Sequence, residues 1–156
     1  MKLEGPVRYR IAILPEPGLF EITDTNGNIK LPAQTRSSLP KLYVVTADEA
    51  PIYVGVTRQS IRSRLRFGFT AKGEHGYHGY RWRHCYNDVT LDLWCHIDPP
   101  EKDKLLDVET IEAEVVFLIR QKGQWPPYQT EIHFHPSTPD HRRTAEAIVR
   151  WYLQSM

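Results

Sequence analysis

The segment 41–66 constrains the fold of this chain more than any other. It holds two short runs rich in β-branched and aromatic residues, at 42–46 and 52–56, separated by a polar stretch that includes a proline. Such runs are typical of β-strands, and the short connection favours antiparallel pairing. A helix is expected next, because Ile61 and Leu65 stand four residues apart and therefore share one helical face. The sequence predicts that the rest of the chain is organised around this unit.

The same unit carries two tyrosines and a set of arginines. Tyr43 and Tyr53 stand near the centres of the two predicted strands, so antiparallel pairing would bring their phenols close together. The helix and the residues just before it add four guanidinium groups, those of Arg58, Arg62, Arg64 and Arg66. We therefore expect phenols and guanidinium groups to meet at one end of a small sheet.

The order and spacing of these residues resemble the GIY-YIG nuclease domain. Leu42 and Tyr43 match the second and third letters of the first motif, and residues 53–55, Tyr-Val-Gly, match the second motif. Lys41 stands where the first motif has a glycine. The resemblance covers about residues 40–130. It implies an α+β core in which a three-stranded antiparallel sheet is flanked by helices.

The resemblance also implies hydrolysis of phosphodiester bonds and a role for each matching residue. Tyr43 would be the general base or position the water, and Tyr53 would orient the water or the phosphate. A phenol has an ordinary pKa near ~10, so a base role requires a nearby cation. Arg64 would stabilise the charge on the non-bridging oxygens. Arg62 is the alternative, because Arg64 stands one residue further from Gly55 than is usual in the family.

A helical glutamate would hold the single divalent ion, Mg²⁺ or Mn²⁺, that the resemblance implies. A largely buried helix is predicted from 105 or 108 to 122, because five apolar residues follow one another at 115–119 and a glycine ends the pattern. Glu114 has the family's spacing to the apolar and aromatic residues that follow, and Glu112 is the alternative. One carboxylate, waters and a phosphate oxygen are the ligands with which Mg²⁺ is usually bound.

Two positions depart from the family's pattern. Gly68 stands four residues after Arg64, where many members have a histidine or tyrosine. Residues of the glycine-rich loop that follows are candidates for the missing proton-transfer partner: Lys72, His75 and His78. The asparagine that is common after the glutamate helix is also absent, and Gln124 or Gln129 is expected to replace it as a polar anchor.

Charge is distributed unevenly, although the net charge is only +1. Residues 58–83 include seven Lys or Arg against one acidic residue, whereas residues 98–114 include seven Asp or Glu against two lysines. This pattern predicts a cationic surface for a polyanion beside an acidic region for a divalent cation. The residues expected to bind nucleic acid are Arg58, Arg62, Arg66, Lys72, His78 and Arg81.

The remaining segments are expected to complete one domain. Residues 1–40 are predicted to be a β extension packed on the catalytic core at 41–130, and residues 131–156 to close that domain. The predicted elements are a strand at 7–14, a hairpin of 20–23 with 28–31 around Asn26-Gly27, a third core strand at 89–97, a short strand at 131–135 and an amphipathic helix at 140–153. His133 and His135 alternate on that short strand, but they lack a third zinc ligand at a recognised spacing.

The chain has no feature of an exported or membrane protein. No apolar run approaches the ~20 residues of a membrane helix, and the N-terminus lacks the apolar stretch of a signal peptide. Its two cysteines, Cys85 and Cys95, do not form a CxxC pair, which favours free, buried thiols in a reducing compartment. The expectation is a cytoplasmic protein with no membrane partner.

Together these features predict a stand-alone DNA endonuclease of restriction, phage or repair type. A homodimer is one possible state, because double-strand cleavage with one site per chain needs either two copies or sequential nicking. One alternative is a catalytically inactive nucleic-acid-binding domain of the same fold. The other is a protein-interaction domain whose basic segment, 58–83, binds an acidic protein.

Overall fold

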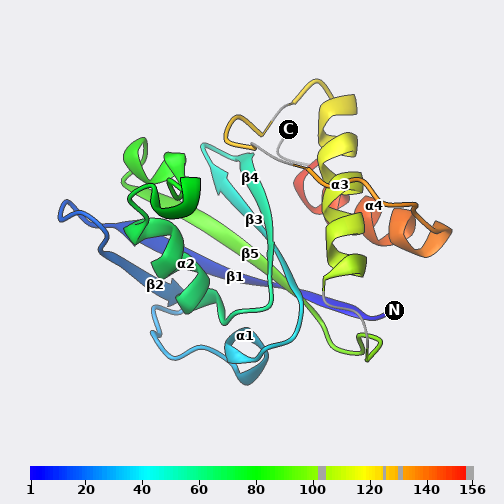
Figure 1. The fold of residues 1–156 in the computed structure, drawn as a ribbon, viewed down its shortest axis with the longest axis horizontal. Coiled ribbons are helices and arrows are strands. Elements are labelled where there is room, and N and C mark those ends of the chain that lie inside the picture. Colours follow the sequence, from blue (N-terminus) through cyan, green and yellow to red (C-terminus); the bar gives the residue numbers. More distant parts are fainter. Residues whose placement is uncertain (102–104, 125, 130–131, 154–156) are drawn as a thin grey trace.

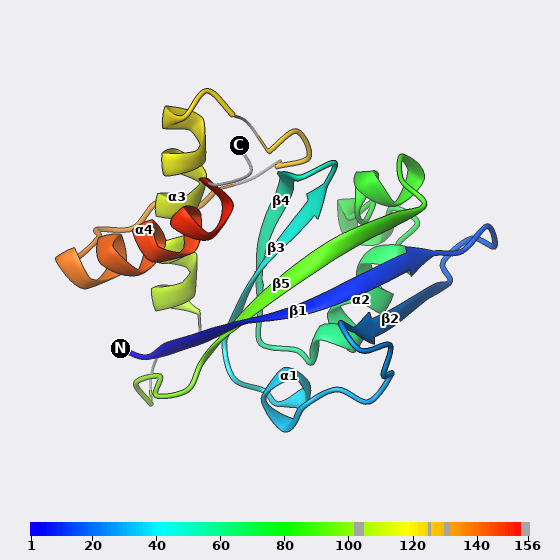
Figure 2. The ribbon, with the colours of Figure 1, turned by 180° about the vertical axis from the view of Figure 1, so that it is seen from behind.

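A five-stranded antiparallel sheet forms the centre of the molecule, with helices against both faces (Figures 1 and 2). The computed structural model describes residues 1–101, 105–124, 126–129 and 132–153. The strands are β1 (Leu3–Ile13), β2 (Phe20–Asp24), β3 (Lys41–Ala47), β4 (Ala50–Thr57) and β5 (Asp88–His96), and their order in the sheet is β2-β1-β5-β3-β4. The helices are α1 (Ala33–Arg36), α2 (Ile61–Thr70), α3 (Leu106–Gln121) and α4 (Pro139–Leu153), with 3-10 turns at Glu74–Gly76 and Arg81–His84.

The predicted strand–strand–helix unit is confirmed as β3, β4 and α2. Asp48 and Glu49 connect the two strands with φ angles of 52° and 66°, and positive φ at both positions suits a two-residue hairpin turn. Ser60 begins the helix, because its hydroxyl accepts a hydrogen bond from the Ser63 N–H at 3.3 Å. That side-chain acceptor satisfies one of the free N–H groups at the start of α2.

The three-stranded sheet expected from the sequence is too small. The strands β3, β4 and β5 are joined by β1, which pairs with β5 from Leu3↔His96 to Ala12↔Asp88, and by β2 on its outer side. Tyr9 and Ile11 of β1 are fully buried in the same hydrophobic cluster as Tyr43. Residues 1–40 therefore supply two strands of the central sheet rather than a layer packed on it.

The predicted hairpin around Asn26-Gly27 is only partly correct. A turn does form there, with the Asp24 N–H donating to the Asn28 carbonyl at 2.9 Å and Gly27 at a φ of 84°. Residues 28–31, however, form no strand. The partner of β2 is β1, because Ile22 pairs with Ile11 and both side chains are buried, whereas residues 28–30 are exposed.

The two faces of the sheet are covered by different helices. Ile61, Leu65 and Phe69 of α2 pack on the face that includes Tyr43 and Val45. The opposite face buries Leu42, Val44, Val54 and Trp94 against α3 and α4. Figure 1 shows this division, with α2 on one side of the sheet and the α3–α4 pair on the other. Because β3 is buried on both faces, its tyrosine lies deep in the molecule.

The helices near the C-terminus agree well with the sequence. Both α3 and α4 lie within a few residues of their predicted bounds, and Gly123 follows α3 with a φ of 78°. The short strand predicted at 131–135 is not formed by 132–135, and residue 131 lies outside the described residues. Within the described part of the chain, no helix is both long enough and apolar enough to cross a membrane.

Candidate active site

A pocket of about 490 Å³ lies at the β4 edge of the sheet, between α2 and α3. Four segments that are distant in the sequence line it: β4, α2, the loop before β5, and α3 with the residues after it. The side chains that matter for chemistry are those of Tyr53, Arg64, Tyr77, His78, Arg81, Glu112 and Gln129. The pocket is thus where one predicted tyrosine, the predicted arginine and the glutamate helix meet.

The two motif tyrosines lie close together, as predicted, but only one lines the pocket. Their ring centroids are 6.0 Å apart. Tyr53 is half-buried and lines the pocket, whereas Tyr43 is fully buried behind it. Tyr43 pairs across the strands with Gly55, and a Cβ atom at Gly55 would overlap the Tyr43 ring. The glycine of the second motif is required here because this ring covers its Cα atom.

A third phenol, which belongs to neither motif, completes this cluster. The Tyr80 hydroxyl lies 2.8 Å from that of Tyr43 and hydrogen-bonds to it. The Tyr80 ring meets the Tyr53 ring edge-on at 5.5 Å. A Cβ atom at Gly68 would overlap the Tyr80 ring, so this tyrosine fills the space that a side chain at position 68 would occupy. The glycine at 68, where many family members have a histidine or tyrosine, is the sequence signal for this contact.

The predicted catalytic arginine, Arg64, lies among aromatic rings and opens into the pocket. Its Cζ atom is 4.9 Å from the ring centroid of Tyr80 and 5.6 Å from that of Tyr77. One N–H group donates to the Tyr77 hydroxyl at 2.9 Å. Among the described residues Arg64 forms no ion pair with a carboxylate. The alternative, Arg62, donates to the Ile29 carbonyl at 2.8 Å and does not line the pocket.

Electrostatics keep the arginine charged and the tyrosines neutral. Burial acts to lower the pKa of Arg64, but the neighbouring phenols outweigh it and the pKa is raised. Burial raises the pKa of both Tyr43 and Tyr53 well above the ordinary value, and the Arg64 cation offsets only part of this effect. A neutral phenol can donate or accept a hydrogen bond, but it is a poor base. The protein alone therefore does not favour Tyr43 as the general base.

The glutamate that reaches the pocket is Glu112, not Glu114. Glu112 is only 6% exposed and lines the pocket together with Tyr53 and Arg64. Glu114 is half-buried and does not line it. Two residues along an α-helix correspond to a rotation of about 200°, so the two carboxylates point in nearly opposite directions. The helical phase of α3, which buries Ile111 and Val115 against the sheet, selects Glu112.

Gln129 is the polar side chain that anchors the edge of β4. Its amide oxygen accepts a hydrogen bond from the Val54 N–H at 2.9 Å, and the Tyr128 N–H donates to the Ile52 carbonyl at 3.1 Å. Gln129 also lines the pocket, whereas Gln124 is exposed. Of the two glutamines that the sequence offered as replacements for the family's asparagine, the structure brings Gln129 to the site.

Of the three loop residues expected to assist proton transfer, one lies at the pocket. His78 lines the pocket, whereas Lys72 lines another pocket, beside residues 14–19. His75 is exposed on the 3-10 turn Glu74–Gly76 and lines neither pocket.

The residues predicted to bind nucleic acid also divide into groups. His78 and Arg81 line the pocket. Arg58 and Arg66 are exposed. Arg62 donates to the Ile29 carbonyl, and Lys72 lines the other pocket, beside residues 14–19.

The acidic residues that the structure describes in segment 98–114 do not gather into one metal-binding cluster. Asp107 accepts hydrogen bonds from His96 and His141, and Glu109 pairs with His135 at 2.9 Å. His133, by contrast, lines the pocket, so the two alternating histidines lie in different surroundings. Within the described residues, no three His, Cys, Asp or Glu side chains are grouped so as to hold a metal.

The cysteines differ from the prediction in one respect. Neither cysteine forms a disulfide within the described residues, but only Cys95 is buried, at 3% exposed, whereas Cys85 is exposed. Cys85 lies just after the 3-10 turn Arg81–His84, outside the hydrophobic clusters.

Comparison with protein-family models, with curated proteins and with solved structures finds no match for this chain. Membership of the GIY-YIG family therefore stays a prediction.

Proposed function

We propose that this protein is a divalent-metal-dependent endonuclease of the GIY-YIG type, which hydrolyses DNA phosphodiester bonds in the pocket between α2 and α3. The observation that supports this most strongly is the charge arrangement. The Arg64 cation is half-buried, forms no ion pair with a carboxylate among the described residues, and shares the pocket with the buried carboxylate of Glu112. A half-buried guanidinium gains stability when an anion binds.

The carboxylate explains why a metal ion is part of the proposal. A phosphate bound to Arg64 would share the pocket with the Glu112 carboxylate, and a divalent cation bound to both would reduce the repulsion between these two anions. Glu112 fits a hard divalent cation that keeps several waters and takes one carboxylate and one phosphate oxygen. Such an ion supplies Lewis-acid stabilisation of charge on the phosphate oxygens. Glu112 replaces Glu114 as the proposed ligand because it alone of the two lines the pocket.

Each remaining side chain has a role that follows from its position. Arg64 would bind the non-bridging oxygens with its planar set of N–H donors. Tyr53, the motif phenol that lines the pocket, would orient the attacking water or the phosphate. Tyr43 would act as a positioning residue through its bond to Tyr80. Of the loop residues considered for proton transfer, His78 alone lines this pocket, so it is the proposed proton-transfer partner.

A second candidate function is a nucleic-acid-binding domain of the same fold that does not cleave. It is favoured by the full burial of Tyr43 and by the upward shift of its pKa, since both disfavour a phenolate base. In this function Arg64, Arg81 and His78 would bind phosphate without any need for a metal ion.

The test is cleavage of plasmid and single-stranded DNA with Mg²⁺ or Mn²⁺ by the wild type, Glu112→Gln and Glu114→Gln. We expect the wild type to cleave. Glu112→Gln should lose about 100-fold or more in rate, the usual cost of removing a group that stabilises transition-state charge. Glu114→Gln is the matched control on the same helix and should keep its activity. The nuclease proposal is wrong if the wild type leaves both substrates intact, or if Glu112→Gln cleaves as fast as the wild type.

A further inference from the structure

An exposed aromatic ring stands beside the pocket and has no part in the hydrophobic core. Phe67 on α2 is 55% exposed, and it belongs to neither hydrophobic cluster. One of its faces stacks on the Tyr77 ring, with centroids 4.9 Å apart and an interplanar angle of 11°. An aromatic ring that remains this exposed after stacking on a neighbour has apolar surface available for a ligand.

This ring is tied directly to the proposed phosphate-binding group. Tyr77 lines the pocket and accepts the hydrogen bond from Arg64. The Arg64 Cζ atom is 5.9 Å from the Phe67 centroid. A phosphate bound by Arg64 would therefore lie about one nucleotide away from the exposed ring. Helix α2 carries arginines at 62, 64 and 66 and no acidic residue, so the surroundings of Phe67 attract a polyanion.

We propose that Phe67 is a stacking subsite for an unpaired nucleobase next to the phosphate held by Arg64. The inference rests on the proposed function and narrows its substrate class to single-stranded or locally unpaired nucleic acid. The reason is geometric: a flat, exposed ring beside a cation can stack on any base, because every base has a π-face. Bases within a duplex are already stacked and paired, so their faces are not accessible without opening the helix.

The Phe67–Tyr77 stack also holds the loop 71–79 beside Arg64. The experiment must distinguish this structural role from base stacking. A probe that differs only in its bases distinguishes the two. An oligothymidylate of about eight nucleotides, within the usual range of single-strand sites, is compared with a chain of the same length built from abasic residues. Both chains carry the same phosphates, so loss of the loop contact would weaken their binding equally.

Binding is measured by fluorescence anisotropy at low salt with Mg²⁺, and the bridging oxygens of every probe are replaced to prevent cleavage. The wild type should bind the thymidylate about tenfold or more tightly than the abasic chain, and more tightly than a duplex of equal length. Phe67→Leu keeps an apolar side chain beside Tyr77 but loses the flat ring, so this ratio should fall toward one. Phe117→Leu, the same change at an exposed position on α3 outside the pocket, should keep the wild-type ratio.

Three results would overturn the subsite: equal binding of both chains by the wild type, an equal loss for both chains in Phe67→Leu, or no binding of the thymidylate. The outcome is separable from that of the nuclease proposal. If the wild type cleaves DNA but the ratio does not depend on Phe67, the subsite is wrong and the nuclease stands. If the ratio depends on Phe67 but no metal supports cleavage, the subsite stands and the nuclease is wrong.

Discussion

Two glycines shape the candidate site because aromatic rings lie where their side chains would be. Tyr43 covers Gly55 and Tyr80 covers Gly68. Gly55 comes from an edge strand and Gly68 from a helix, and neither has a positive φ. Both glycines are therefore required by packing rather than by backbone conformation. The rings they admit surround Arg64 and Tyr53, so these two positions control the geometry of the pocket.

Replacing Gly68 with alanine should change the free energy of unfolding in the direction opposite to that in an ordinary helix. In an ordinary helix, alanine is more stable than glycine by about 0.5–1 kcal/mol. Here Gly68→Ala should instead lower the free energy of unfolding by about 1–3 kcal/mol, because the new methyl group overlaps a buried ring. In a Tyr80→Ala background the ring is gone, and the same substitution should be stabilising. Urea unfolding of the four proteins measures both effects. Stabilisation by Gly68→Ala in the wild type would contradict the packing described here.

The sequence predicted some residues of the site and could not predict others, for physical reasons. The meeting of Tyr43 and Tyr53 follows from two adjacent strands and a short turn, which are local features. Tyr80 comes from a loop, and its contact with Tyr43 spans 37 residues, so no local pattern encodes it. The choice between Glu112 and Glu114 depends on which side of α3 faces β4. That phase is set by the packing of the whole helix.

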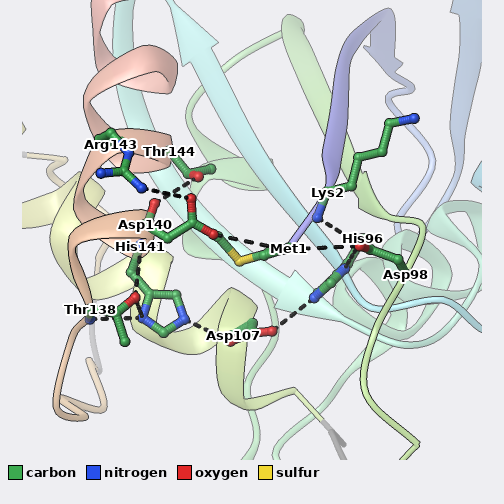
Figure 3. A network of polar contacts seen from close by, with 10 residues as sticks. All are labelled: Met1, Lys2, His96, Asp98, Asp107, Thr138, Asp140, His141, Arg143 and Thr144. Atoms are coloured by element: carbon green, nitrogen blue, oxygen red, sulfur yellow. Dashed lines mark hydrogen bonds and ion pairs between the residues drawn. The ribbon is translucent and has the colours of Figure 1, made fainter.

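At the scale of elements, one carboxylate connects β5, α3 and α4. Asp107, in the first turn of α3, lies between His96 of β5 and His141 of α4 (Figure 3). The His96 and His141 Nε2 atoms are 2.9 Å and 2.6 Å from its two oxygens. Thr138 completes the junction through its contact with the His141 Nδ1 atom at 3.1 Å. This junction fixes the start of α3, the helix that carries Glu112.

Asp107→Asn tests this junction through its dependence on pH. Burial acts to raise the pKa of Asp107, but the hydrogen bonds to His141 and His96 outweigh it, so the pKa is lowered. A lowered pKa in the folded state stabilises the protein above the ordinary aspartate value near ~4. At pH 7 the variant should therefore be less stable by about 1–3 kcal/mol. The difference should vanish as the pH falls through the lowered pKa, which unfolding at a series of pH values measures. A difference that grows toward low pH would contradict this account.

Elements that depend on local patterns were predicted better than those that depend on distant pairing. The unit β3–β4–α2 and the two later helices follow from periodicity, turn residues and helix-ending glycine. The partner of β2 did not follow, because Asn26-Gly27 is a strong local turn signal and the pairing of β1 with β5 joins residues more than 70 positions apart. Once β1 occupies that edge of β5, the burial of Ile22 against Ile11 determines the outer hairpin.

At the scale of the whole molecule, the sheet separates a helix rich in arginine from a helix rich in carboxylates. Helix α2 covers one face and α3 the other (Figure 1). The two helices approach a common pocket at the edge strand β4, where Arg64 and Glu112 both line the space beside Tyr53. In the proposed function, the uneven charge along the sequence would form one site for a phosphate and a cation at this sheet edge.

The most direct test is a crystal structure with Mn²⁺ and a short single-stranded DNA whose bridging oxygens are replaced to prevent cleavage. The anomalous signal of manganese locates the ion without relying on activity. We predict a single peak within bonding distance of the Glu112 carboxylate, with a phosphate of the DNA on the Arg64 guanidinium and beside Tyr53. A peak at Glu114, or DNA bound with Arg64 free of phosphate, would contradict the proposed active site.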